Sequence, residues 1–325
     1  MAALPGKSGG VNAYANPSPV ILNLGKLKNP MLKTLTEHLF SLVQTILPQH
    51  FLSGVMHRLA RCENRPWKTA FIKTIVYLYG VDLGEAKETN PDAYASFNAF
   101  FTRALKPDAR PRCNDPDALL CPADGAISQI GNITAGSIFQ AKGKYFSAME
   151  LLGGDVERAK PFENGKFATI YLSPRDYHRL HMPLSGTLRE MVHVPGRLFS
   201  VNAATVNSVP NLFARNERVA AIFDTEAGPM ALVLVGAIFV SSIETVWHGE
   251  VTPPTVQQVK TWTYSGDAPS LAKGEEMGRF NMGSTIIVLF GANAVAWEEG
   301  LKAGDKVKLG RRLGRVNSAF SNIKA

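Results

Sequence analysis

The hydrophobic pattern changes its period once along this chain, and this change constrains the fold more than any other feature. Before residue 80, apolar residues recur every three or four positions, as one face of a helix requires; the first set is Leu32, Leu35, Leu39, Leu42, Val43 and Ile46. From Leu119 onward, short β-branched or aromatic runs alternate with Gly, Pro and Asn, as strands and turns do; the runs are 167–172, 231–240, 256–264 and 285–290. The sequence therefore predicts an α+β fold, in which amphipathic N-terminal helices precede a mostly β domain.

This pattern divides the chain into three regions. Residues 1–20 are rich in Gly, Pro, Ala, Ser and Asn and lack the apolar core of a signal peptide, so we expect a disordered leader. Residues 21–88 should form the helical region, with stop signals at Pro48 and Gly80. Residues 89–325 should form the β-rich domain. No stretch reaches the roughly 20 apolar residues that a bilayer span needs.

Positive charge is concentrated in the helical region. The whole chain has a formal net charge of +8, and between Ile21 and Gly80 eight Lys and Arg stand against only two Glu. Basic amphipathic helices suit an anionic membrane surface, but helices that pack on the core with a solvated basic face explain the pattern equally well. Nucleic acid is the less favoured partner, because the charge lies on helices with apolar periodicity.

The number and spacing of the cysteines argue against a disulfide framework and against a zinc site. Cys62, Cys113 and Cys121 form no CxxC pair, and their odd number does not suggest a disulfide framework. Neither cysteine nor histidine shows the spacing of a zinc site. We therefore expect a reducing compartment and no metal.

Three short clusters could carry chemistry. Asp124 lies in a Pro-Ala-Asp-Gly turn, where backbone amides can hold a carboxylate ionised. His178 and His181 follow a predicted strand, and histidine exchanges protons near neutral pH. Gly283 and Ser284 precede an apolar strand. Each cluster alone has an ordinary structural explanation. Their order permits a nucleophilic triad, as in subtilisin-like hydrolases, but there is no GxSxG elbow.

The three clusters together resemble the motifs of the bacterial phosphatidylserine decarboxylases. The segments that carry the resemblance are PADG at 122–125, YLSPRDYHRLHMP at 171–183 and GST at 283–285, with support from 96–103, 202–218 and 235–237. It covers about residues 33–314, and YHRLHMP is its most specific part. One departure is Met282, where the family usually has leucine, an apolar residue of similar volume.

The resemblance implies a proenzyme that cuts itself between Gly283 and Ser284. The Ser284 hydroxyl would attack the Gly283 carbonyl, with His181 as the base and Asp124 orienting it; a glycine at 283 would allow close approach. Elimination would then split the chain and leave dehydroalanine at position 284. This residue would tautomerise and lose ammonia to give a pyruvoyl group, a covalent cofactor made from Ser284. This ketone would form a Schiff base with the amine of phosphatidylserine and take up electrons as carbon dioxide leaves, giving phosphatidylethanolamine. His178 would protonate the resulting carbon.

The resemblance also implies where the protein works and with what. We expect a peripheral protein on the cytoplasmic face of the bacterial inner membrane, a carboxy-lyase of phospholipid biosynthesis. Its partners would be phosphatidylserine and an anionic membrane surface. The fragments 1–283 and 284–325 would stay together as a heterodimer, and this pair would form a homodimer.

Two other classes of protein remain open on the residues alone. A serine hydrolase could use Asp124, a histidine and Ser284, and its chain would stay intact. A non-enzymatic β-barrel module is suggested by residues 300–307, whose turn-and-strand pattern is similar to that of carrier-type hybrid barrels. That segment lacks a modifiable lysine in a tight hairpin.

Overall fold

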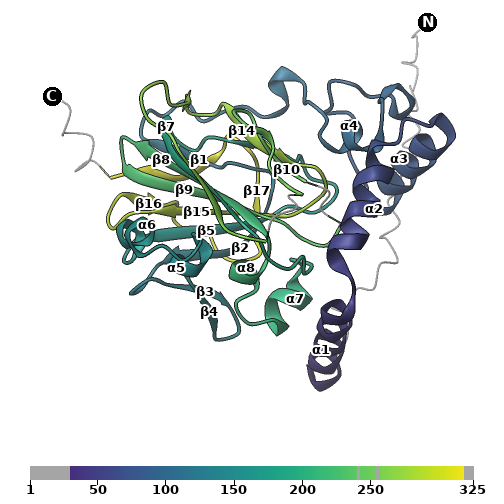
Figure 1. Ribbon diagram of the computed structural model, residues 1–325. Helices are drawn as coiled ribbons and strands as arrows, with labels where there is room; N and C mark the ends of the chain where they lie inside the picture. The colour runs from purple at the N-terminus through teal and green to yellow at the C-terminus, as the bar shows by residue number, and fades with distance from the viewer. Residues whose placement is uncertain (1–29, 240–241, 254–256, 318–325) are drawn as a thin grey trace, which may run out of the picture.

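Three helices open the fold. The computed structural model describes residues 30–239, 242–253 and 257–317, so the predicted leader lies outside the described residues. The helices are α1 (Pro30–Ile46), α2 (Gln49–Arg61) and α3 (Arg65–Tyr79) (Figure 1). Local signals set their ends. Pro48 precedes α2, the Asn64 side chain accepts a hydrogen bond from the backbone of Trp67, and Gly80 ends α3 in the left-handed conformation.

Aromatic side chains hold the helices to the segment that follows. This segment contains the short helices η2 (Pro91–Ala93), α4 (Phe97–Phe101) and η3 (Pro107–Ala109). The rings of Phe71 and Phe97 stack at a centroid distance of 3.9 Å. Together with Tyr94, Phe100 and Phe101 they form what we call the aromatic cluster, which packs α3 against α4.

A nine-stranded antiparallel sheet forms the centre of the molecule. Its strand order is β12-β7-β8-β9-β15-β5-β2-β17, with β13 also paired to β7. The strands are β2 (Gly125–Asn132), β5 (Lys166–Tyr171), β7 (Gly186–Val194), β8 (Arg218–Thr225), β9 (Gly228–Val235), β12 (Lys260–Thr263), β13 (Ser270–Leu271), β15 (Thr285–Phe290) and β17 (Lys306–Val307). β15 is buried throughout and lies between β9 and β5. Residue 284 therefore directly precedes a strand that has neighbours on both sides.

Smaller sheets and short helices surround this sheet. A four-stranded sheet has the order β11 (Gly249–Glu250), β10 (Ile243–Thr245), β14 (Glu276–Phe280), β6 (Arg179–His181), and a three-stranded sheet the order β1 (Ala118–Leu120), β18 (Arg312–Val316), β16 (Val295–Trp297). The remaining elements are the hairpin β3 (Ser137–Ala141) and β4 (Lys144–Ser147), and the helices α5 (Ala148–Leu151), α6 (Val156–Ala159), η4 (Lys160–Phe162), α7 (Ala203–Ser208) and α8 (Leu212–Arg215). The predicted α+β class is confirmed.

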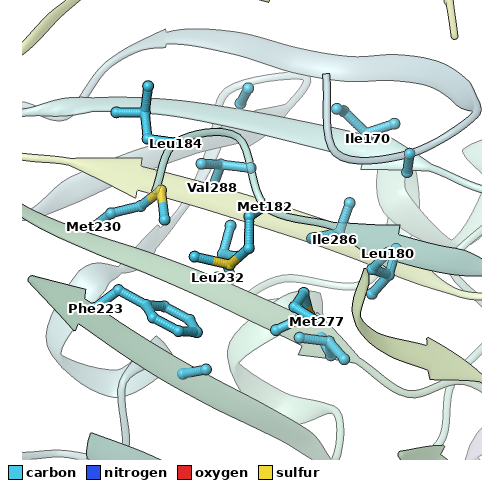
Figure 2. Close-up of a cluster of buried hydrophobic side chains, with 14 of the residues drawn as sticks. Ile170, Leu180, Met182, Leu184, Phe223, Met230, Leu232, Met277, Ile286 and Val288 are labelled. Carbon is cyan, nitrogen blue, oxygen red and sulfur yellow. The ribbon is translucent and has the colours of Figure 1, made fainter. Parts of the chain in front are cut away.

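Two apolar layers cover the two faces of the large sheet. Ile286 and Val288 of β15 belong to one buried cluster, which Figure 2 shows with Met182 and Leu232 around them. The alternate residue Ile287 and its strand neighbour Leu289 belong to the cluster on the other face. Because both faces of β15 are closed to water, its sequence is continuously apolar instead of alternating.

Candidate active site

The Gly283–Ser284 junction lies in a short connection between two sheets. Residues 281–284 join β14 of the four-stranded sheet to β15 of the large sheet. Ser284 is fully buried. Its hydroxyl donates to the carbonyl oxygen of Val235 and accepts from the backbone N–H of Thr285 at 2.6 Å. Its own carbonyl accepts from the N–H of Leu172 at 2.9 Å, so Ser284 is held on both sides by the sheet.

His178 lies beside this junction. It is fully buried, and its ring lies 4.0 Å from that of Phe101, centroid to centroid. Nδ1 is 2.8 Å from the carbonyl oxygen of Asp176, which fixes the proton on Nδ1. Nε2 has no hydrogen-bond partner among the described residues and lies 3.4 Å from the position that a Cβ atom would take on Gly283. The unprotonated nitrogen therefore lies beside Gly283.

Burial keeps the His178 ring neutral. Loss of solvation and, after it, the charge of Arg103 lower the pKa of His178 to about 3. The imidazole is thus uncharged at any pH near neutrality. It can accept a proton at Nε2, but so low a pKa makes it a weak base.

His181 lies on β6 and faces a different space. Its Nδ1 is 2.9 Å from the carbonyl oxygen of Gly274 and its Nε2 is 3.4 Å from the hydroxyl of Tyr177. It lines a cavity of about 220 Å³ together with Arg110 and Arg112. Burial lowers the pKa of His181 as well. The hydrogen bond to Tyr177 is long, so this ring nitrogen is held only weakly.

Asp124 is buried and tied to basic residues. Its carboxylate accepts from Arg110 Nε at 2.9 and 3.0 Å, from Lys308 Nζ at 3.2 Å and from the N–H of Leu309 at 2.9 Å. Burial alone would raise the pKa of Asp124, but the bonds from Arg110 and Leu309, with the charges of Arg110 and Lys308, outweigh it and the pKa is lowered. The carboxylate is ionised, held by a guanidinium more than by the backbone amides of its turn.

One expectation about this site needs correction. The structure shows no hydrogen bond between Asp124 and His181, because Arg110, Lys308 and Leu309 take up the carboxylate and Gly274 and Tyr177 take up the imidazole. A Cβ atom on Gly283 would meet nothing closer than 3.4 Å, so the predicted role of this glycine, close approach to its carbonyl, does not concern packing. The unusual backbone lies one residue earlier, at Met282, whose φ is 107°.

Two arginines near the site were not singled out in the sequence. Arg110 lies outside every motif, and only the fold brings it to Asp124. Arg103 ends the SFNAFFTR segment. It is 4% exposed, and one of its nitrogens donates to the carbonyl of Arg175 while Nε and Nη1 have no partner among the described residues.

An apolar pocket of about 600 Å³ reaches the junction. Helices α1, α3 and α4 contribute Phe40, Tyr79 and Phe97 to its wall, and Met282 and Gly283 lie at the junction end. The described residues include no group of three or more His, Cys, Asp or Glu arranged to hold a metal ion. The Gly283–Ser284 junction at the end of an apolar pocket is therefore the candidate active site, of the class in which a concave, mostly apolar pocket meets a few polar groups.

Comparison with known proteins gives the family. The model described as phosphatidylserine decarboxylase matches residues 97–315, and one described as PSD matches residues 39–80. The chain belongs to the phosphatidylserine decarboxylase family, which confirms the resemblance seen in the motifs.

Relatives from three bacteria match nearly the whole of their own length. Proteins named phosphatidylserine decarboxylase proenzyme from Methylococcus capsulatus, Azotobacter vinelandii and Bordetella pertussis are 58%, 55% and 60% identical to this chain. The alignments cover 85%, 86% and 85% of this chain and 96%, 99% and 94% of the relatives.

Proposed function

We propose that this chain is a proenzyme that cuts itself between Gly283 and Ser284 and then converts phosphatidylserine to phosphatidylethanolamine and carbon dioxide. The observation that carries the proposal is the junction itself: a serine fixed by the sheet, a glycine before it, and an unpartnered ring nitrogen of His178 beside that glycine. Family membership supports the same reaction.

Self-cleavage uses the residues at the junction. The Ser284 Oγ attacks the Gly283 carbonyl carbon, the peptide C–N bond breaks, and elimination across residue 284 then separates the chains. His181 is the proposed base, as the resemblance of the YHRLHMP segment implies. Its ring borders a cavity and is held weakly at Nε2, so it can exchange Tyr177 for another partner. His178 is the nearer ring, but its pKa of about 3 makes it the poorer base. Asp124 acts on the site indirectly: its negative charge holds Arg110 and Lys308 in place.

The surroundings of residue 284 suit a pyruvoyl group. Residue 284 directly precedes the buried strand β15, and its neighbour Gly283 lies beside the free Nε2 of His178 and lines the apolar pocket. There a small ketone would be shielded from water. Formed from Ser284, the group supplies the carbonyl that takes up the substrate amine and the electrons released with carbon dioxide. His178 takes up a proton at its free Nε2 and passes it to the reacting carbon, and the lipid chains occupy the apolar pocket.

We further propose that α1 docks on the membrane with its apolar side. Its polar residues face the protein: Glu37, Ser41 and Gln44 are buried, and Gln44 accepts from the N–H of Ser200 at 2.7 Å. Its apolar residues face outward, with Leu35 64% and Ile46 78% exposed. A helix with this orientation is unfavourable in water and favourable at a lipid surface. For α1, these exposures argue against the alternative in which the helices pack on the core with a solvated basic face, whereas α3 does bury Ile72 in this way.

The basic charge contributes less to this surface than its sequence position suggests. The Lys68 ammonium is buried and donates to the carbonyl oxygens of Asp92 and Tyr94, and Arg61 pairs with Glu250 at 3.2 Å. No helix of the described residues has the length and apolar content that crossing a membrane requires. We propose a peripheral protein on the cytoplasmic face of the bacterial inner membrane, bound mainly by apolar contact and assisted by anionic lipid. A homodimer of the cleaved pair stays a prediction.

The two rival classes have little support. A serine hydrolase needs a serine that its substrate can reach, and Ser284 is fully buried in the uncut chain. Within 300–307, β17 is the edge strand of the large sheet, paired with β2, so this segment is not a separate module.

The experiment that tests the function measures carbon dioxide released from vesicles of carboxyl-labelled phosphatidylserine. Purified protein should release label and form phosphatidylethanolamine, and Ser284→Ala should release none. Release by the Ser284→Ala variant at the normal rate would exclude residue 284 as the reacting group.

A further inference from the structure

The backbone immediately before the cleavage junction is strained. Met282 has φ of 107°. The left-handed region that side chains other than glycine can enter lies near φ of +57°. The other non-glycine residues with positive φ in the described part of the chain all lie between 46° and 66°. Met282 alone among them is outside that region, in a range where a Cβ atom is costly.

Hydrogen bonds on both sides prevent this strain from relaxing. Upstream, the N–H of Phe280 donates to the carbonyl of His178 at 3.0 Å and that of Asn281 to the carbonyl of Ser242 at 2.9 Å. Downstream, the carbonyl of Ser284 accepts from Leu172, and Thr285 is paired on both sides in the large sheet. Two different sheets thus fix the ends of a four-residue connection.

The Met282 side chain is fixed as well. It packs against the aromatic cluster formed with α3 and α4 and lines the apolar pocket. Rotation of the Met282 backbone to a relaxed φ would move this side chain out of its contacts. The strain is therefore held by the sheets at the ends and by side-chain packing in the middle.

We propose that the strained backbone of Met282 promotes self-cleavage, which makes Met282 a positioning residue for the reaction. This inference rests on the proposed function. In the first step the Ser284 Oγ–carbonyl carbon bond of the ester forms, the Gly283–Ser284 C–N bond breaks, and the hydroxyl proton ends on the freed nitrogen. Elimination then breaks the Ser284 Cβ–Oγ bond, which leaves Gly283 as a carboxylate and separates the two chains. The uncut chain carries the strain, and the cut one residue after Met282 lets it relax. Strain of the usual size for such a residue would accelerate cleavage roughly tenfold to a hundredfold.

The test compares Met282→Gly with Met282→Ala. Both variants lose the side chain beyond Cβ, but only glycine adopts a φ of 107° without cost. Cleavage should therefore be about tenfold slower in the glycine variant than in the alanine variant. The rate is measured from the appearance of the two chains on a gel after synthesis. Met282→Leu, which restores an apolar side chain with a Cβ atom, should cleave faster than the glycine variant.

A second measurement separates strain from a loss of order. In the uncut Ser284→Ala background, a glycine at an ordinary position is less stable than alanine. At a strained position glycine is the more stable of the two, so the melting temperature of Met282→Gly should be roughly 2 °C higher than that of Met282→Ala. Equal cleavage rates, or glycine melting below alanine, would overturn the inference while cleavage of the unaltered chain still stands. If the unaltered chain does not cleave at all, the proposed function itself fails.

Discussion

At the scale of single residues, burial of His178 has a consequence for stability. An unfolded histidine titrates near pH 6.5, whereas the pKa of buried His178 is about 3. Below pH 6.5 the unfolded chain therefore binds a proton that the folded chain does not. The contribution of this group is complete above pH 6.5 and is lost as the pH falls toward 3, at up to about 1.4 kcal/mol for each pH unit.

We therefore expect the free energy of unfolding to fall less steeply with acid when His178 is replaced. The free energy of unfolding is measured with denaturant at several pH values between 4 and 7. The single variant Ser284→Ala is compared with the double variant Ser284→Ala, His178→Gln. His38, exposed on α1, provides the control substitution, and His38→Gln should leave the slope as it was. Identical slopes with and without His178 would show that this histidine is not buried as described.

The two histidines should also differ in which reaction they support. His181→Ala should block cleavage, and Asp124→Ala should block or slow it, because it leaves Lys308 without this carboxylate and Arg110 with Glu85 alone. His178→Ala should still cleave at least in part yet decarboxylate phosphatidylserine about a hundred- to ten-thousand-fold more slowly. Chain cleavage and product formation are followed in each variant. An uncut His178→Ala together with normally cut His181→Ala would reverse the two assignments.

The sequence could predict the members of this site better than their contacts. The motifs indicated Asp124, both histidines and the junction, since those residue types occur at fixed offsets within short segments. A three-residue spacing does not say which histidine faces Gly283, and the structure has His178 there. Arg110 could not be found because its contact with Asp124 depends on how β1, β2 and the segment before them come together.

At the scale of elements, periodicity predicted the three helices but not the direction that α1 faces. An apolar stripe shows that a helix is amphipathic, and the same stripe suits a protein core or a lipid surface. The contacts of the polar stripe decide which side of α1 faces the protein. Glu37 pairs with Lys142 at 3.0 Å and Gln44 bonds to Ser200, so the polar side is the one that meets the protein. Four strands of the large sheet, β5, β9, β12 and β15, fall on predicted runs, because a short, continuously apolar run such as 285–290 suits a strand with both faces covered. β7 and β8 were not predicted.

The apolar face of α1 should dominate membrane binding. Replacing Leu35, Leu39 and Leu42 with serine removes exposed side chains whose burial in lipid contributes about 1.5–3 kcal/mol each. We expect affinity for vesicles containing phosphatidylserine to fall at least roughly a hundredfold in a sedimentation assay, with little change in melting temperature. Val156→Ser is the matched control, since Val156 is 58% exposed on α6, on the other side of the β-rich part from α1 (Figure 1). Unchanged binding by the triple variant would contradict docking through α1.

At the scale of the whole molecule, cleavage at 283–284 would separate the chain in sequence but not in space. β15 pairs with β9 and β5 along its whole length, and β18 pairs with β1 and β16. The fragment 284–325 thus supplies a central strand of the large sheet. Dissociation of this fragment would expose both apolar layers of the large sheet to water, so the two fragments should stay together until the protein is denatured. The helical region and the β-rich part meet at the apolar pocket, whose wall includes residues of α1 at one part and of the junction at another.

The central claim is that residue 284 changes its chemistry when the chain is cut, and an intact-mass spectrum of the denatured protein tests it most directly. We predict two species, 1–283 and 284–325. The smaller should have the mass of a chain that begins with pyruvoyl in place of serine, with an N-terminus blocked to Edman degradation. Ser284→Ala should give a single full-length mass. A single full-length mass for the unaltered, active protein, or a smaller fragment that begins with an ordinary serine, would contradict the account.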